Sequence, residues 1–214
     1  MNEVNKRNIE FWNQFYEKEH GNGFVESHWL DMFNEIIAGV RGPVVDLGCG
    51  NGYDTAYLLD KNKKVIACDG SINAVFNVKN NYPSVSSAMC FDMLDGFPLS
   101  NNMTNLIIAD LCLHYFTKED TIGILKEMRR ILVNKGHILL RVNSINDENY
   151  GVGQGTEVEP HLYLTEDGRY KRFFASSDIY DMFNLFDIKY VREAMMNRYK
   201  LTKKLYVVDL KNCK

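Results

Sequence analysis

The sequence has few of the residues that build disulfide frameworks or metal centres. Its 214 residues include only five cysteines and four prolines. The cysteines stand singly, with no C-x-x-C pair, at positions Cys49, Cys68, Cys90, Cys112 and Cys213. Such scattered thiols in apolar stretches are typical of a reduced, cytoplasmic protein. The five histidines also show no spacing typical of zinc ligands, so the sequence predicts no metal site.

Long apolar runs and an excess of positive charge are missing as well. The apolar stretch at residues 106–113 is short and contains Asp110, so it does not predict a membrane span. Residues 1–12 lack the apolar core of a signal peptide. The net charge of -3 gives no reason to expect nucleic acid or an anionic membrane as a partner. We therefore expect a cytoplasmic protein, monomeric or homodimeric, with neither partner.

Apolar residues follow helical spacing at the start of the chain and alternate between strand and helix patterns after residue 43. One helical face carries Ile9, Trp12, Phe15 and Tyr16, and a second begins near Trp29, with a turn predicted at residues 21–23. Strands are predicted at residues 43–47, 64–68, 86–91, 105–109 and 137–142. Helices lie between them, with Ser71 and Thr117 as expected N-caps. This alternation indicates a parallel sheet covered on both faces.

The pattern breaks after Asn143. Residues 144–172 are polar and rich in glycine and tyrosine, so we expect a long loop or lid there. A helix and two strands without a helix between them follow, which predicts a hairpin at the sheet edge. The predicted fold is α/β: a Rossmann-like, doubly wound, mostly parallel seven-stranded sheet with a C-terminal antiparallel hairpin and N-terminal lid helices. We expect one domain over residues 1–214, divided into N-terminal helices (1–42), cofactor-binding core (43–143), loop or lid (144–172), and final helix and hairpin (173–214).

The stretch VVDLGCGNGYDT, residues 44–55, combines a glycine loop with carboxylates. Glycines let a ligand approach the backbone closely, with a helix N-terminus behind the loop. The spacing is G-x-G-x-G rather than the dinucleotide fingerprint G-x-G-x-x-G. A pyrophosphate would also meet Asp46 at close range, which is electrostatically unfavourable, whereas a cationic ligand would be attracted. Asp54 is either a second contact to such a ligand or a first-turn acid favoured by the helix dipole.

These residues resemble the first motif of class I S-adenosylmethionine-dependent methyltransferases. Further motifs match in order: Asp69 after the second strand, Asp92-Met93 after the third, residues 109–115 (ADLCLHY) after the fourth, and residues 132–137 (LVNKGH) leading into the fifth. The glycine loop also resembles the small-molecule branch that includes tellurite-resistance and thiopurine-type methyltransferases. Tyr53 departs from the arginine typical of similar loops.

The resemblance implies S-adenosylmethionine as cofactor and S-adenosylhomocysteine as product. It places Asp69 on the ribose hydroxyls and Asp92 near adenine; the alternative for Asp92 is a turn cap, and the alternative for Asp110 is a solvated loop acid. The cofactor-binding residues that we predict are Tyr16, Asp46, Gly48, Cys49, Gly50, Asn51, Asp69, Gly70, Ser71, Asp92, Met93, Asp110 and Leu111. Tyr16 is included as an aromatic face for the sulfonium; the alternative for Tyr16, Trp12 and Trp29 is ordinary core packing.

Methyl transfer from a sulfonium needs alignment more than acid–base chemistry, so no catalytic residue is required. His114 is the candidate base if the acceptor carries a proton; otherwise it is an ordinary hydrogen-bonded histidine at a strand end. The substrate candidates are His114, Tyr115, Asn143 and Tyr150.

We predict methyl transfer by in-line displacement to a small-molecule acceptor. An RNA methyltransferase, a nicotinamide oxidoreductase and a non-catalytic cofactor-binding module are the alternatives. The absence of proline after Asp110 argues against a base-amino methyltransferase, which typically has an Asn/Asp-Pro-Pro-aromatic motif there.

Overall fold

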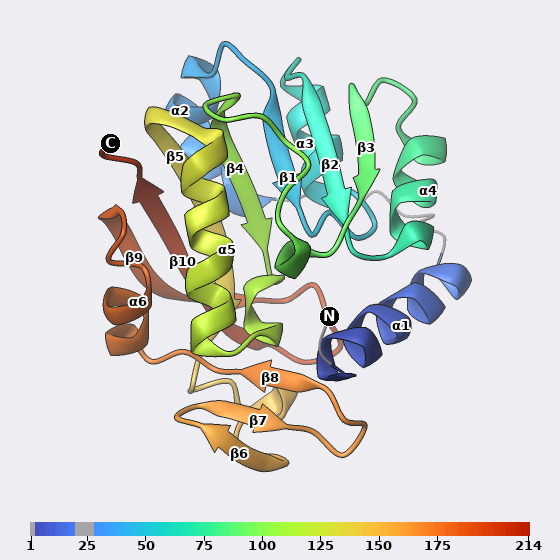
Figure 1. Ribbon diagram of the computed structural model, residues 1–214, viewed down its shortest axis with the longest axis vertical. Helices are drawn as coiled ribbons and strands as arrows, with labels where there is room; N and C mark the ends of the chain where they lie inside the picture. The colour runs from blue at the N-terminus through green and yellow to red at the C-terminus, as the bar shows by residue number, and fades with distance from the viewer. Residues whose placement is uncertain (1–2, 20–27) are drawn as a thin grey trace.

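A seven-stranded sheet forms the centre of the protein, whose computed structural model describes residues 3–19 and 28–214 (Figure 1). Its strand order is β3-β2-β1-β4-β5-β10-β9. The parallel part comprises β1 (Val44–Leu47), β2 (Val65–Asp69), β3 (Ser87–Cys90), β4 (Thr104–Asp110) and β5 (Leu132–Asn143). The hairpin of β9 (Asp187–Met196) and β10 (Lys203–Lys211) continues the sheet antiparallel to β5. The predicted fold class is confirmed, while the turn expected at residues 21–23 lies outside the described residues.

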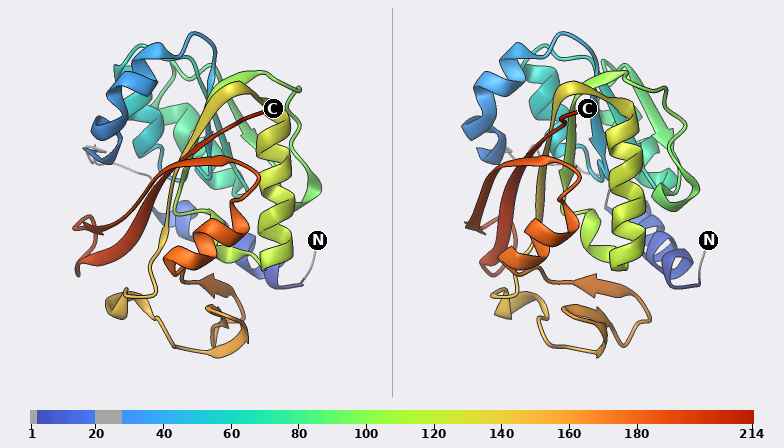
Figure 2. Two further views of the ribbon diagram at one scale, coloured as in Figure 1. Left: turned by 90° about the vertical axis from the view of Figure 1, so that its left-hand side faces the viewer. Right: turned by 60° about the vertical axis from the view of Figure 1, so that its left-hand side comes forward.

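Helices cover both faces of the sheet (Figure 2). On one face lie α5 (Lys118–Ile131) and α6 (Ser176–Met182). On the other lie η1 (His28–Phe33), α2 (Asn34–Gly39), α3 (Tyr53–Asp60) and α4 (Ile72–Asn81). Alternate strand residues serve the two faces, because Val45 packs with the α5 side and Val44 with the α3 side. Both positions are fully buried, which explains why the strands are apolar throughout.

Local signals placed most of these elements correctly. Ser71 accepts a hydrogen bond from the Ala74 amide (3.2 Å), and Thr117 accepts one from the Asp120 amide (3.1 Å), so both predicted N-caps are confirmed. Residues 132–136, expected to lead into the fifth strand, instead belong to β5, which begins at Leu132. Short 3₁₀ turns, η2 (Met93–Asp95) and η3 (Leu113–Tyr115), follow β3 and β4.

The segment expected as a long loop contains a small sheet. After η4 (Glu148–Tyr150), β6 (Thr156–Glu159), β7 (Leu162–Leu164) and β8 (Tyr170–Arg172) pair antiparallel. The prediction of a loop was wrong because strands of three or four residues bury too few side chains to leave a clear alternating pattern. The Phe174 amide bonds to the Asn143 carbonyl (2.7 Å), which ties the end of the small sheet to β5.

Helix α1 (Glu3–Lys18) lies across the end of the sheet where β1 and β2 terminate (Figure 1). It is attached to α4, since Asn13 accepts a hydrogen bond from the Ser71 hydroxyl (2.9 Å) and Asn77 donates one to the Tyr16 carbonyl (2.8 Å). Of the N-terminal helices predicted as lids, only α1 has this position; η1 and α2 pack against the sheet. No helix in residues 3–19 or 28–214 is long and apolar enough to cross a membrane.

Candidate active site

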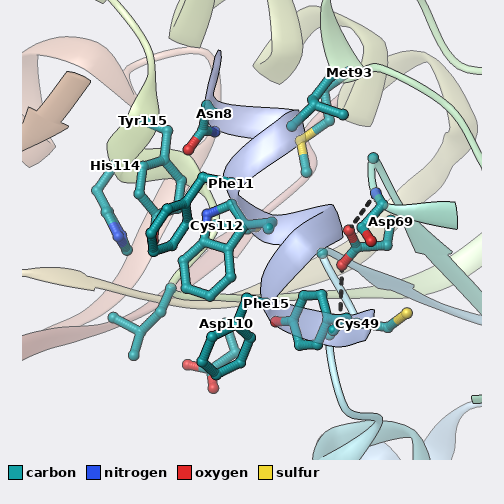
Figure 3. Close-up of a pocket in the computed structure, with 18 of the residues that line it drawn as sticks. Asn8, Phe11, Phe15, Cys49, Asp69, Met93, Asp110, Cys112, His114 and Tyr115 are labelled. Carbon is teal, nitrogen blue, oxygen red and sulfur yellow. Dashed lines mark hydrogen bonds between the residues drawn. The ribbon is translucent and has the colours of Figure 1, made fainter. Parts of the chain in front are cut away.

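A cavity of about 650 Å³ lies where the parallel strands end, beneath α1 (Figure 3). Its walls come from the loops after β1, β2, β3 and β4, from the small sheet, and from the turn between β9 and β10. Ligands of doubly wound sheets bind outside the carboxyl ends of the strands, where this cavity is. Its volume is within the range of small-molecule sites.

The glycine loop after β1 forms the cavity floor. Gly48, Gly50 and Gly52 have positive φ angles of +73°, +49° and +78°. A Cβ at Gly48 would lie 2.4 Å from the Cys112 Cβ, and one at Gly50 would lie 2.5 Å from the Tyr16 hydroxyl oxygen. Conformation and space therefore both require glycine at these positions.

Asp69, at the end of β2, organises this loop. One carboxylate oxygen accepts the Gly50 amide (2.9 Å) and the other accepts the Ser71 amide (2.8 Å). Each oxygen keeps the capacity for a second hydrogen bond. Burial raises the pKa of Asp69, while the amides of Ser71, Gly50 and Gly70 act in the opposite direction.

Two further carboxylates, Asp46 and Asp54, are buried at the other side of the loop, with exposed fractions of 1% and 5%. Asp46 accepts a hydrogen bond from the Thr55 hydroxyl (2.5 Å), and Asp54 accepts one from the Trp29 indole (2.9 Å). Burial, followed by the proximity of Asp54, raises the pKa of Asp46 well above its usual value. A bound cation would relieve this repulsion. Asp54 stands in the first turn of α3, where the helix dipole favours an acid, and it also lines the cavity.

Asp110 is not the solvated loop acid that the sequence allowed. Its carboxylate forms a bidentate ion pair with Arg141 (2.6 and 2.7 Å), and Arg198 lies 3.4 Å away. Burial by itself would raise the pKa of Asp110, but the Arg141 guanidinium and then Arg198 outweigh it, so the pKa lies below its usual value. The Trp29 ring lies 4.7 Å from the Arg141 guanidinium.

Asp92 caps a turn, which was one of the two roles weighed for it. It caps η2 by accepting the Leu94 amide (3.0 Å), and its other oxygen accepts the Asn5 side-chain amide (2.6 Å). It also lines the cavity together with Met93. Asn5 therefore joins α1 to the loop after β3.

Every predicted cofactor-binding residue lines the cavity: Tyr16, Asp46, Gly48, Cys49, Gly50, Asn51, Asp69, Gly70, Ser71, Asp92, Met93, Asp110 and Leu111. Among the substrate candidates, His114, Tyr115 and Tyr150 line it as well, although the Tyr150 hydroxyl is engaged with the Leu201 backbone. Asn143 does not line it. Its side chain is fully buried and donates to the Arg172 carbonyl, because the small sheet covers the end of β5.

His114 is not the ordinary hydrogen-bonded histidine of the alternative interpretation. Its ring is buried, and its Nδ1 has no hydrogen-bond partner among the described residues. Burial, and then the nearby cations of Lys203, Lys171 and Arg169, lower the pKa of His114 well below its usual value. The imidazole is therefore neutral at physiological pH.

Sequence reasoning missed two groups of cavity residues. From α1 come Asn5, Asn8, Ile9, Phe11, Trp12 and Phe15. The apolar face of α1 was visible in the sequence, but core packing was an equally good explanation for it. The cations Arg169 and Lys171 lie in the segment expected as a loop or lid, whereas Arg198 and Lys203, at the turn between β9 and β10, left no signal.

Unpartnered polar atoms concentrate around the cavity. Seven buried side-chain nitrogen or oxygen atoms in the described residues have no hydrogen-bond partner, and four of them belong to residues that line the cavity: Asn8, Trp12, Asn51 and His114. Buried polar groups are normally satisfied, so this concentration indicates a bound ligand.

Comparison with known proteins agrees with this geometry. Residues 44–136 match a family model described as a methyltransferase domain. The protein thus carries a methyltransferase domain and is an S-adenosylmethionine-dependent methyltransferase. The match covers β1 to the start of β5, which are the elements that carry the glycine loop, Asp69, Asp92 and Asp110.

Proteins that are similar over most of the chain share little sequence identity with it. The chain is 23% identical over 197 residues to a tRNA N(3)-methylcytidine methyltransferase, trm141, of Schizosaccharomyces pombe, covering 81% of this chain and 77% of that protein. A methyltransferase from Anabaena variabilis has a similar fold, with TM-score 0.71, 19% identity, and coverage of 99% and 96%. So has the 1,6-didemethyltoxoflavin-N1-methyltransferase of Burkholderia thailandensis, solved with its acceptor and S-adenosylhomocysteine (TM-score 0.67, 17% identity, coverage 100% and 92%).

The methyltransferase cofactor fits the cavity on structural grounds. S-adenosylmethionine has no phosphate and carries a sulfonium and an ammonium, and the loops after β1 and β2 offer carboxylates and glycine backbone. The cavity also has unpartnered polar atoms that such a ligand would satisfy.

Proposed function

We propose that this methyltransferase acts on a small-molecule acceptor that binds beside the cofactor in the cavity under α1. S-adenosylmethionine supplies an activated methyl group. The acceptor's lone pair forms the new bond to the methyl carbon, while the carbon–sulfur bond breaks and leaves its electron pair on sulfur. The remaining work of the protein is to align the two molecules and exclude water.

Each carboxylate binds a different part of the cofactor. Asp69 accepts the two ribose hydroxyls with the capacity left by the Gly50 and Ser71 amides. Asp46 and Asp54 attract the ammonium of the methionine end, which explains why two buried carboxylates stand together. Asp92 and Met93 border adenine.

Aromatic side chains of α1 cover the reacting region. Trp12 stacks on Tyr16 with ring centroids 5.7 Å apart and meets the Tyr115 ring edge-on at 5.9 Å. Their ring faces attract a sulfonium and exclude water. If the acceptor carries a proton at its nucleophilic atom, the neutral His114 accepts it at Nδ1.

The contact between α1 and the segment next to β8 is the observation that supports the choice of a small acceptor. Helix α1 and the small sheet meet above the cavity, where the Arg169 guanidinium lies 3.5 Å from the centre of the Phe11 ring. A polynucleotide base would have to displace this contact, whereas a small molecule fits beneath it. The similarity to a tRNA methyltransferase keeps RNA as the competing acceptor.

The test presents both acceptor classes to the full-length protein. Methyl-labelled S-adenosylmethionine is incubated with the protein and either a metabolite extract or bulk tRNA. We expect label in a product below about 1 kDa and none in tRNA. Label in tRNA alone would overturn the proposal, and label in neither would favour a non-catalytic cofactor-binding module. Arg169→Ala serves as a second reporter, since opening the lid should admit solvent and slow transfer to a small acceptor.

A further inference from the structure

The acidic and basic residues of the cavity wall come from different parts of the chain. Among the described residues, the carboxylates that line it all lie at or before position 110: Glu19, Asp46, Asp54, Asp69, Asp92 and Asp110. The four lysines and arginines that line it all lie at or after position 169, in or near β8 and at the turn between β9 and β10. A cationic cofactor matches the first group of residues.

Three of the four cations already have a carboxylate partner. Lys203 is paired with Asp147 (2.9 Å), Arg169 with Asp167 (2.7 Å), and Arg198 lies near Asp110 (3.4 Å). The pairs of Lys203 and Arg169 leave little net charge for a ligand, whereas Arg198 shares Asp110 with Arg141.

Lys171 differs from the other three. Its ammonium donates to the Tyr150 carbonyl, which is neutral. Within residues 3–19 and 28–214, no carboxylate lies within 4 Å of it. The side chain is half-buried and lines the cavity. A partly desolvated cation without a counter-ion is unfavourable by itself and becomes favourable when an anion binds.

The surroundings of Lys171 suit a small organic anion. His114 Nδ1 has no partner in the described structure and lies close enough to Lys171 for the ammonium to lower its pKa. Tyr115 and Tyr199 line the same part of the wall with aromatic surface. An anion here would also oppose the cations' effect on His114, which makes the imidazole a better proton acceptor once the ligand has bound.

We propose that the methyl acceptor is an anion, whose carboxylate or phosphate group pairs with Lys171 while a separate atom of the same molecule receives the methyl group. The anionic group anchors the acceptor and is not consumed. This inference rests on the proposed small-molecule function and specifies its substrate class.

The first experiment determines the charge of the product. Metabolites from the labelling reaction are separated on an anion exchanger at neutral pH, and the labelled compound is identified by mass. Retention as a carboxylate or as a phosphate ester supports the inference, and treatment with a phosphatase distinguishes the two. A labelled product that is neutral or cationic overturns the inference but leaves the proposed function intact. Label in no small molecule refutes the proposed function, and the inference falls with it.

The second experiment removes the cation. With the identified acceptor, Lys171→Met should raise KM by about 10- to 100-fold, because a hydrogen bond between charged groups is lost. Affinity for S-adenosylhomocysteine should stay unchanged, which also shows that the variant is folded. Lys171→Arg should recover much of the loss. Lys200→Met is the matched control, since Lys200 is exposed in the same region and does not line the cavity. An unchanged KM in Lys171→Met would overturn the inference.

Discussion

Asp69 offers a direct test of how the cavity holds a ribose. Its two oxygens accept the Gly50 and Ser71 amides at 2.9 and 2.8 Å. Each oxygen can therefore accept one further hydrogen bond, and the two together suit the vicinal diol of a ribose. Asp69→Asn keeps one carbonyl acceptor and turns the other oxygen into a donor. One buried amide then loses its partner, which costs about 1–3 kcal/mol of stability. For a chain of this length, that corresponds to a fall in Tm of roughly 2–12 °C.

A loss of stability alone would not show that Asp69 touches the ligand. We therefore combine Asp69→Asn with S-adenosylhomocysteine analogues that lack the 2′- or 3′-hydroxyl, and measure affinity by calorimetry. In the wild-type protein, each missing hydroxyl should weaken binding by about 1–3 kcal/mol, or roughly 5- to 150-fold. In the variant, the same analogue should bind almost as well as S-adenosylhomocysteine, because the interaction is already gone.

The coupling energy between the Asp69→Asn substitution and the removal of a ribose hydroxyl decides whether the ribose assignment holds. A coupling energy near zero would refute the ribose assignment and leave Asp69 as a residue that only supports the glycine loop. Asp95→Asn is the control: Asp95 is exposed, lies outside the cavity and should show neither the fall in Tm nor the coupling.

Three further predictions concern buried charges. Arg141→Met should destabilise the protein by about 3–5 kcal/mol in denaturant unfolding, because Asp110 then stays buried without its bidentate partner. Asp46→Asn should raise the free energy of unfolding of the cofactor-free protein at pH 7 by on the order of 1 kcal/mol, and with it the Tm, while weakening S-adenosylmethionine binding; calorimetry and thermal unfolding together check this. Burial, and then the cation of Lys203, lower the pKa of Lys171 to about 8. The KM for the anionic acceptor should therefore rise as the pH increases above about 8, which initial rates from pH 6.5 to 9.5 would measure.

The signs of these effects follow from the direction of each pKa shift. The pKa of Asp46 is raised in the folded protein, so its ionised form opposes folding; stability is fully present below the unfolded pKa and is lost as the pH rises through the folded pKa. Replacing Asp46 with neutral asparagine removes the free-energy cost of burying the ionised carboxylate. Asp110 has a lowered pKa, so its pair with Arg141 stabilises above the unfolded pKa and is lost as the pH falls through the folded one.

For Lys171, only the protonated form pairs with an anion. The groups that act on it are Lys203 and Arg169, which lower its pKa, and Asp147 and Asp167, which raise it. A KM that stays constant across pH 8 would contradict the pairing. A lower Tm for Asp46→Asn at pH 7 would contradict the argument from buried charge, and an Arg141→Met variant as stable as the wild type would show that Asp110 is solvated.

The sequence by itself determined the sheet, the glycine loop and the acidic half of the cavity. These features depend on neighbours in the chain: apolar runs in β1, β2 and β4, a cap at Ser71, and an acid at the carboxyl end of each strand. Because parallel strands all end at one edge, Asp46, Asp69 and Asp110 were bound to lie near one another once the topology was known.

Only the tertiary structure decided what covers this edge and what charge faces the acceptor. The apolar face of α1 fits a core or a lid equally well, and only the structure places this face at the cavity, with Phe11 against Arg169. Asn143 appeared available in the sequence but is buried beneath the small sheet. Lys171 and Lys203 line the same cavity from β8 and β10. The spacing of apolar residues in the sequence does not indicate which distant residues the fold brings together. Long-range electrostatics is a property of the folded arrangement, so the charge of the acceptor could be inferred only from the structure.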